Sequence, residues 1–128
     1  MYITPNAFDA SLNYIKNNVE NLYVCSAEPT TFLEASSTYR LGVKALPAIL
    51  APADYTVVET GETGRQITVS AITDGVLESA SGTVAYIALT DDSNNELLYV
   101  KPVNIAQLIS GQTVFTLQSF NIRHKNPA

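Results

Sequence analysis

Arg65-Gln-Ile-Thr-Val-Ser-Ala-Ile72 opens the stretch of sequence that decides the fold. Its residues alternate between polar and apolar, which places Ile67 and Val69 on the same face of a predicted strand. Asp74-Gly75 follows, and such a pair favours a tight hairpin turn. We therefore expect the stretch from Arg65 to Lys125 to form the core of an antiparallel β domain.

Gly82 opens a further strand, and two turn signals divide the rest of this stretch. The turn signals are the polar segment Asp91-Asp-Ser-Asn-Asn95 and Ser110-Gly111. Glycine, asparagine and aspartate accept turn dihedral angles easily, so each signal marks a change of chain direction. The strands expected between these turns are Thr83–Leu89, Glu96–Val100, Thr113–Leu117 and Phe120–Arg123.

The N-terminal segment predicts one amphipathic helix, from Pro5 to about Val19. Thr4-Pro5 is a suitable start, because the hydroxyl can cap and the proline lacks an N–H that would be unpaired there anyway. The apolar residues recur at spacings of four and three, as Phe8, Leu12, Ile15, Val19 and Leu22. The expected outer face carries Asp9, Asn13, Lys16, Asn17 and Glu20. Such a helix packs on the β domain or docks on another subunit.

The segment between the helix and the β core predicts a mixture of short elements. Leu22–Ser26 is expected to be a strand, and Thr31 with Glu34 matches a capping box that starts a short helical turn through about Ser36. Further on, the expected elements are a part-strand at Tyr39–Leu46, an irregular arm at Ala45–Ala53, a strand at Asp54–Glu59 and a flexible loop at Gly61–Gly64. Pro47 and Pro52 argue against a central strand in the arm.

The length and pattern together predict a single domain, residues 1–128, that buries its own core. Within it, residues 1–22 form the helix and entry, 23–64 the mixed segment, and 65–125 the β core. The expected fold is mainly β, an antiparallel β-sandwich of Ig-like or jelly-roll-like type, with one N-terminal amphipathic helix and about seven or eight strands.

The charge balance excludes some partners. Twelve acidic residues against seven basic ones give a net charge of -5, whereas a protein that neutralises phosphates needs the opposite sign. Nucleic acid is therefore not an expected partner. No apolar stretch has the length of a membrane helix, and residues 1–6 lack the features of a signal peptide, so we expect synthesis in a cytoplasm and no membrane partner.

Cys25 is the single cysteine of the chain, which excludes an internal disulfide framework and a cysteine-rich zinc site. Its apolar neighbours favour a small buried hydrophobe, with a reactive thiol or an intersubunit bridge as the alternatives. Cys25 and His124 are the only pair of the cysteine-protease kind. Neither lies in a motif that would position it, so no catalytic residue is predicted.

Two further segments have possible ligand-binding chemistry. Asp91–Glu96 is rich in oxygen ligands, but it lacks the spaced acidic residues and central glycine of a calcium loop, and a hairpin turn explains it. Gly61–Arg65 lacks the Lys-Ser/Thr of a phosphate loop and precedes a strand instead of a helix. Tyr86 and Tyr99 fit a core or a sheet face better than a sugar-stacking platform. The sequence therefore predicts no cofactor-binding and no metal-binding residue.

Several segments resemble a group of small, poorly characterised tailed-bacteriophage proteins. The likeness lies in Leu12–Asn18, Leu22–Thr31 with Glu34-Ala35, Leu41-Gly42, Gly64-Arg65, Ala71–Gly75, Gly82–Asp91 and Ser110–Arg123. It covers most of the chain but carries no catalytic or ligand-binding motif. The resemblance implies a virion structural protein, made in the host cytoplasm and built into the particle.

The expected function is therefore that of a non-catalytic virion protein that decorates or cements the head, or attaches at the neck or tail. Its partners would be capsid or tail subunits and further copies of itself in a homo-oligomer, for which a trimer is one option. The arm at Ala45–Ala53 or a terminus would lie on neighbouring subunits, and many weak contacts would add up through multivalency. The alternative is a receptor- or glycan-binding module of a phage tail, using the loops Asp91–Asn95 and Gly61–Gly64.

Overall fold

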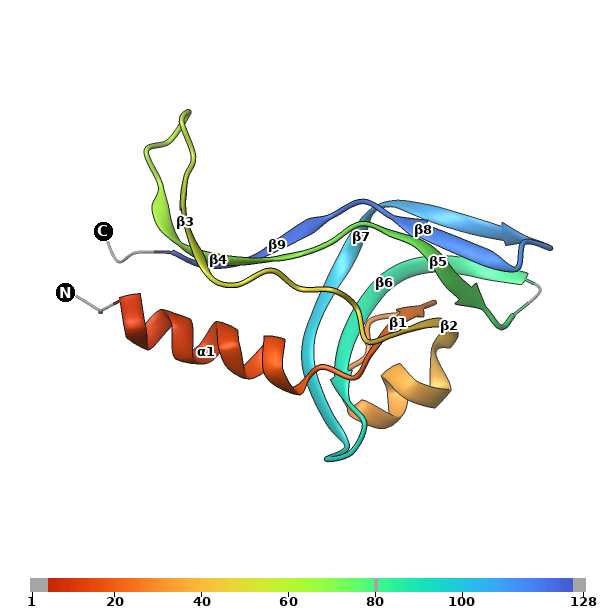
Figure 1. The fold of residues 1–128 in the computed structure, drawn as a ribbon. Coiled ribbons are helices and arrows are strands. Elements are labelled where there is room, and N and C mark those ends of the chain that lie inside the picture. Colours follow the sequence, from red (N-terminus) through yellow and green to blue (C-terminus); the bar gives the residue numbers. More distant parts are fainter. Residues whose placement is uncertain (1–4, 80, 126–128) are drawn as a thin grey trace.

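The computed structural model describes residues 5–79 and 81–125, which form a mainly β fold with one N-terminal helix (Figure 1). The elements are α1 (Pro5–Asn18), β1 (Asn21–Cys25), the π-helical turn η1 (Glu34–Thr38), β2 (Arg40–Ala45), β3 (Ala53–Thr56), β4 (Thr63–Val69), β5 (Ile72–Leu77), β6 (Ser81–Asp91), β7 (Glu96–Ser110), β8 (Val114–Leu117) and β9 (Phe120–Lys125). The described residues thus contain nine strands, slightly more than the sequence predicts.

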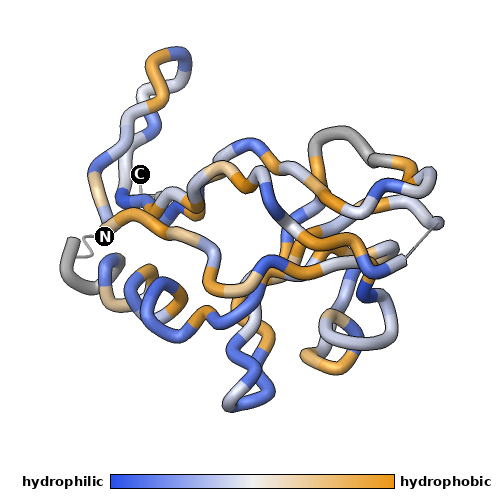
Figure 2. Tube along the Cα trace, turned by 45° about the vertical axis from the view of Figure 1, so that its right-hand side comes forward, coloured by the Kyte–Doolittle hydropathy of each residue, from blue (hydrophilic) through white to orange (hydrophobic). Residues whose placement is uncertain are grey.

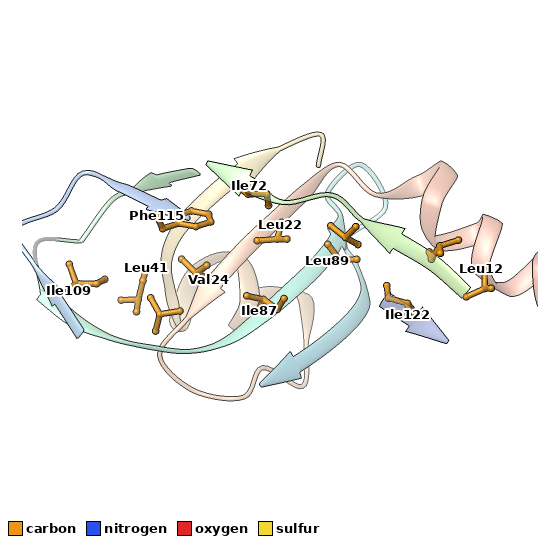
Figure 3. Close-up of a cluster of buried hydrophobic side chains, with 13 residues drawn as sticks. Leu12, Leu22, Val24, Leu41, Ile72, Ile87, Leu89, Ile109, Phe115 and Ile122 are labelled. Carbon is orange, nitrogen blue, oxygen red and sulfur yellow. The ribbon is translucent and has the colours of Figure 1, made fainter. Parts of the chain in front are cut away.

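The strands form two antiparallel sheets that enclose a common core. The larger sheet has six strands in the order β7-β6-β1-β2-β5-β8, and the smaller has three in the order β3-β4-β9. Figure 3 shows the side chains gathered between them, with Leu22, Val24 and Ile87 from the larger sheet and Ile122 from the smaller. The predicted antiparallel, sandwich-like β fold with an N-terminal helix is therefore confirmed.

Strand β4 follows the predicted alternation. Ile67 and Val69 are fully buried in the core, and the strand pairs with β3 on one side and β9 on the other. Burying two β-branched side chains from one face stabilises a strand by about 1.5 to 3 kcal/mol for each side chain. The central position of β4 in the smaller sheet follows from this pattern.

The prediction of a hairpin turn at Asp74-Gly75 is wrong, because both residues lie inside β5. The chain instead passes from the smaller to the larger sheet after Val69, through Ser70 and Ala71. Gly75 serves packing: a Cβ at this position would overlap the ring of Phe115 on β8. The glycine therefore makes room for a core aromatic residue.

The two later turn signals are confirmed, and Gly82, which was expected to open a strand, is the second residue of β6. Residues 92–95 connect β6 to β7 in an antiparallel hairpin, and Asp91 pairs with Glu96 at its closed end. Gly111, with a φ of 83°, lies in the turn between β7 and β8, where the left-handed conformation favours glycine. β7 is much longer than expected, since it continues from Glu96 to Ser110.

Helix α1 packs on the smaller sheet, alongside β4 and β9 (Figure 1). Leu12 is almost fully buried, and Ile15 and Val19 pack against the same core, as the spacing predicts. The side chain of Phe8 lies outside the described residues. The helix therefore covers its own β domain, which was one of the two expected arrangements.

The segment after β1 folds back over the outer side of the larger sheet. The Oγ1 of Thr31 accepts a hydrogen bond of 3.1 Å from the backbone N–H of Glu34, as in a capping box. The Glu34 carboxylate returns to the N–H of Thr30 instead of Thr31, at 2.9 Å. The helical turn continues to Thr38 and covers a second apolar cluster, which consists of Tyr23, Cys25, Ala35 and Ala88.

The arm at Ala45–Ala53 is irregular, as predicted, but it is attached to its own chain. The N–H of Leu50 donates to the carbonyl of Thr68, and the N–H of Ser70 donates to the carbonyl of Ala48, both at 2.8 Å. Ile49 forms an isolated bridge with Val69. The expected strand at Asp54–Glu59 is shorter and begins earlier, as β3.

Candidate interaction surfaces

Cys25 and His124 lie on different sheets, on β1 and β9 respectively. The Cys25 thiol is fully buried and donates a weak hydrogen bond of 3.7 Å to the carbonyl of Ala35. Burial raises the pKa of this thiol to about 11. The structure therefore supports the interpretation of Cys25 as a buried core residue and does not bring the pair together.

Cys25 is expected to resist thiol reagents in the folded protein. A buried group whose pKa is raised stays protonated, so its contribution to stability is complete below the unfolded value of about 8.5 and is lost as the pH rises towards 11. A colorimetric thiol assay at about pH 8 should give almost no signal from the native protein and one equivalent after denaturation in urea. Rapid labelling of the native protein would contradict this burial, and Cys25→Ala controls for background.

The acidic turn at residues 91–95 uses its carboxylates to close the β6–β7 hairpin. Asp91 accepts hydrogen bonds from the backbone N–H of Asn94 at 3.3 Å and from its side-chain amide at 2.7 Å, which lowers the pKa of Asp91. Asp92 accepts hydrogen bonds of 2.6 Å from the hydroxyls of Tyr23 and Thr90. Within the described ranges, no three histidine, cysteine or acidic side chains are grouped to hold a metal ion.

Arg65 joins three elements instead of binding a phosphate. Its guanidinium donates to both carboxylate oxygens of Asp9 on α1, at 2.9 and 2.8 Å, and to Asp54 on β3 at 2.9 Å. The placement of Asp9 on an outer helix face was therefore wrong, because the partner 56 residues away in the sequence turns it towards the sheet. A bidentate ion pair of this kind fixes the orientation of α1 on the smaller sheet.

Acidification is expected to weaken the attachment of α1. The hydrogen bond from Arg65 holds the pKa of Asp9 below its ordinary value, so the pair stabilises the fold above the unfolded pKa and loses that contribution as the pH falls through the folded pKa. The difference in unfolding free energy between wild type and Asp9→Asn should be constant above about pH 5 and shrink below about pH 4. A difference that does not change with pH would show that the pair does not form. Glu28→Gln, at an exposed carboxylate, is the matched control.

A groove of about 490 Å³ opens where β5, β7, β8 and the start of β9 meet. We call it the Lys101 groove. Its apolar lining comes from Ile72, Ile87, Val103, Leu117 and Phe120, and its polar lining from Thr73, Lys101, Thr116, Gln118 and Ser119. The isoleucines belong to the buried core, so the base of the groove is rigid.

Lys101 is the charged residue of this groove. Its ammonium lies 4.7 Å from the centre of the Phe120 ring, a cation–π distance. Arg40, Lys44 and Arg65 form ion pairs with Glu78, Asp74, Asp9 and Asp54, and Lys101 takes part in none of these pairs. The groove therefore presents a positive charge above an apolar base, in a protein whose net charge is -5.

The β3–β4 hairpin projects from the body of the molecule, and Figure 2 shows hydrophobic and hydrophilic residues side by side at its tip. Val58 lies there with 87% of its surface exposed, next to the exposed Glu59. The N–H of Val57 donates to the carbonyl of Glu62 at 2.8 Å, and the N–H of Gly61 donates to the carbonyl of Val57 at 2.7 Å. These bonds close the loop, so the tip is a preformed structure.

The outward face of the larger sheet carries a row of apolar cross-strand neighbours. Across β7, β6, β1, β2, β5 and β8 this apolar row consists of Val100, Ala88, Tyr23, Val43, Val76 and Val114. The segment around η1 covers the middle of the row, where Tyr23 and Ala88 are buried. At the β5–β8 end, Val76 and Val114 remain 53% and 50% exposed.

The two loops expected to form one binding surface lie apart, since the β3–β4 hairpin and the β6–β7 turn are at different ends of the molecule (Figures 1 and 2). Tyr86 and Tyr99 are half-buried, each against one of the two apolar clusters, as expected of sheet residues.

Sequence reasoning missed the Lys101 groove entirely. Its lining comes from four separate segments, so no local motif could reveal it.

Comparisons with family models, with curated proteins and with solved structures gave no match for this chain. In the part of the chain that the structure describes, no helix is long and apolar enough to cross a membrane.

Proposed function

We propose that this chain is a non-catalytic structural protein of a tailed-bacteriophage particle, present in many copies and attached to the head, neck or tail. The resemblance of its sequence to small phage proteins is the reason for proposing a place in a phage particle. The exposed apolar residues support a role in adhesion. Its partners are other virion proteins and further copies of itself.

The observation that carries this proposal is the projecting β3–β4 hairpin with Val58 at its tip. Val58 does not pack into the protein's own core, since 87% of its surface is exposed to solvent. A single exposed apolar residue is common on protein surfaces. Here, however, it stands on a hydrogen-bonded projection, where burial against a neighbour costs little ordering entropy.

Adhesion would proceed by burial of small apolar patches on a symmetric lattice. The exposed end of the apolar row, at Val76 and Val114 on the larger sheet, offers a second such patch. Each contact is weak, but many copies held on one particle raise the effective concentration and hence the total strength of attachment. The two-sheet core supplies a rigid body between these contacts.

The proposal is tested by the copy number of the protein in gradient-purified particles of the phage that encodes it. Quantitative mass spectrometry should find it in a fixed ratio to the major capsid or tail protein, and that ratio should survive a salt wash. A protein that is absent from the particles, or present in irregular trace amounts, would refute the proposal. A particle protein known to be internal serves as the control for contamination.

A receptor- or glycan-binding module is the second candidate, and the Lys101 groove favours it. Hydroxyl and amide groups from Thr73, Thr116 and Gln118 surround an apolar base, which is the mixture that small-ligand sites use. A glycan array that gives a specific signal for wild type and none for Lys101→Glu would support this function. Equal signals for both proteins would exclude the groove as the binding site.

A further inference from the structure

We propose that the tip of the β3–β4 hairpin of one copy inserts into the Lys101 groove of a second copy, with Val58 on the apolar base and Glu59 beside Lys101. This inference rests on the proposed function, because it names the contact by which copies would adhere. The binding partner of the groove is then a second copy of this chain.

The hairpin tip is suited to insertion because its shape is fixed before binding. The backbone bonds between Val57 and Gly61 and between Val57 and Glu62 close the loop, and Gly61 takes the left-handed conformation with a φ of 71°. Below the loop, the Tyr55 hydroxyl donates to the Glu62 carboxylate at 2.9 Å. A β-branched residue such as Val58 also loses little side-chain freedom on burial.

The groove is suited to receive this tip. Its volume of about 490 Å³ admits a pair of side chains, and its base offers apolar surface from the core. Lys101 is held at the wall by the Phe120 ring, so its ammonium is positioned before the contact forms. Val58 would cover apolar surface, while Glu59 would reach the ammonium.

The charges of the two surfaces are complementary. Among the described residues, the ion pairs of Arg40, Lys44 and Arg65 include neither Glu59 nor Lys101. Glu59 is exposed, and Lys101 is half-buried beside the Phe120 ring. By contrast, the carboxylates of Asp54 and Asp9 are already bound to Arg65. In an acidic protein, a lysine without an ion pair gains from meeting a carboxylate of the next copy, and such a contact also suppresses wrong registers.

The contact is heterologous, because the hairpin and the groove are different surfaces. Each copy therefore offers one tip and one groove, and copies join head to tail into a ring or an open filament. A closed ring would agree with the homo-oligomer expected from the sequence. A symmetric two-fold dimer in which the same patches meet would not be produced by this contact.

Charge reversal tests this contact in solution. Sedimentation velocity over a concentration series at low ionic strength should show self-association of wild type, weakened at least about tenfold by Glu59→Lys and by Lys101→Glu. The double variant, and an equal mixture of the two single variants, should recover the association. Val58→Thr, which keeps the side-chain shape, should also weaken it.

Glu28→Lys and Lys16→Glu are matched controls, since they make the same charge changes away from both surfaces. Equal circular dichroism spectra and thermal midpoints show that every variant is folded. A wild type that stays monomeric at its highest soluble concentration overturns the inference. So does association that the reversals at positions 59 and 101 do not weaken more than the controls do, or that the double variant fails to recover.

The outcome is separate from that of the proposed function. Particles that contain the protein in a fixed ratio, with Glu59→Lys retained as well as wild type, would leave the structural role intact and remove this contact from it. Specific self-association in solution by a protein absent from particles would support the contact and refute the structural role.

Discussion

Gly64→Ala is expected to disrupt the smaller sheet and to lower the free energy of unfolding by about 3 kcal/mol. A Cβ at this position would overlap the carbonyl oxygen of His124 on β9 and would lie 2.9 Å from a ring carbon of Tyr55 on β3. The first of these is a backbone atom, so it cannot rotate away as a side chain can. The β4 and β9 backbones would have to separate, at the cost of their pairing.

Urea denaturation followed by far-ultraviolet circular dichroism measures this loss. Gly61→Asn is the matched control, because nothing lies within 4 Å of the Cβ position at Gly61 and asparagine tolerates its positive φ. The control should remain within about 0.5 kcal/mol of wild type. If Gly64→Ala is as stable as the control, the close approach of β4 and β9 is wrong.

Leu22→Ala is expected to destabilise the fold by about 2 to 5 kcal/mol. Leu22 lies on β1, near the middle of the larger sheet, and its side chain is fully buried in the core between the sheets. Truncation removes apolar contacts and leaves a cavity that strands paired on both sides cannot close.

Leu33→Ala provides the comparison, since the same atoms are removed from a side chain that is 65% exposed. Its effect should be within about 0.5 kcal/mol. The two variants, measured by the same denaturation series, separate core burial from the intrinsic effect of a leucine-to-alanine change. Similar losses in both would contradict the position of Leu22 in the core.

The parts of the fold that the sequence predicts well are those set by neighbouring residues. The alternation around Ile67 and Val69 marks β4 because each strand residue faces the opposite side from the next. The spacing of Leu12 and Ile15 marks α1 in the same way. Both patterns depend only on which side of the element faces an apolar environment, and the core is that environment.

The predictions that failed depend on residues far away in the sequence. Asp74-Gly75 has the local composition of a turn, but Gly75 is required by Phe115, which arrives from β8. Asp9 has the position of an outer helix residue, but Arg65 on β4 turns it towards the sheet. Local propensity is overruled in both cases by a tertiary contact.

The candidate surfaces show the same limit more strongly. The flexible loop expected at Gly61–Gly64 is only partly correct, because Thr63 and Gly64 lie in β4. The projection of the remaining loop from the body depends on how β3 and β4 pair in the smaller sheet. Lys101 has no distinguishing neighbours in the sequence, and its position over Phe120 exists only after β7 and β9 are assembled. Prediction of these surfaces from sequence would have required the strand order of both sheets.

Electron microscopy of phage particles with and without this protein decides whether it is built into the virion. Ordered density of the two-sheet fold is expected at regular positions on the head, neck or tail, and it should be absent from particles that lack the gene. The projecting hairpin should point into a neighbouring copy. Complete particles with no such density, and with unchanged stability when the protein is missing, would contradict a structural role in the virion.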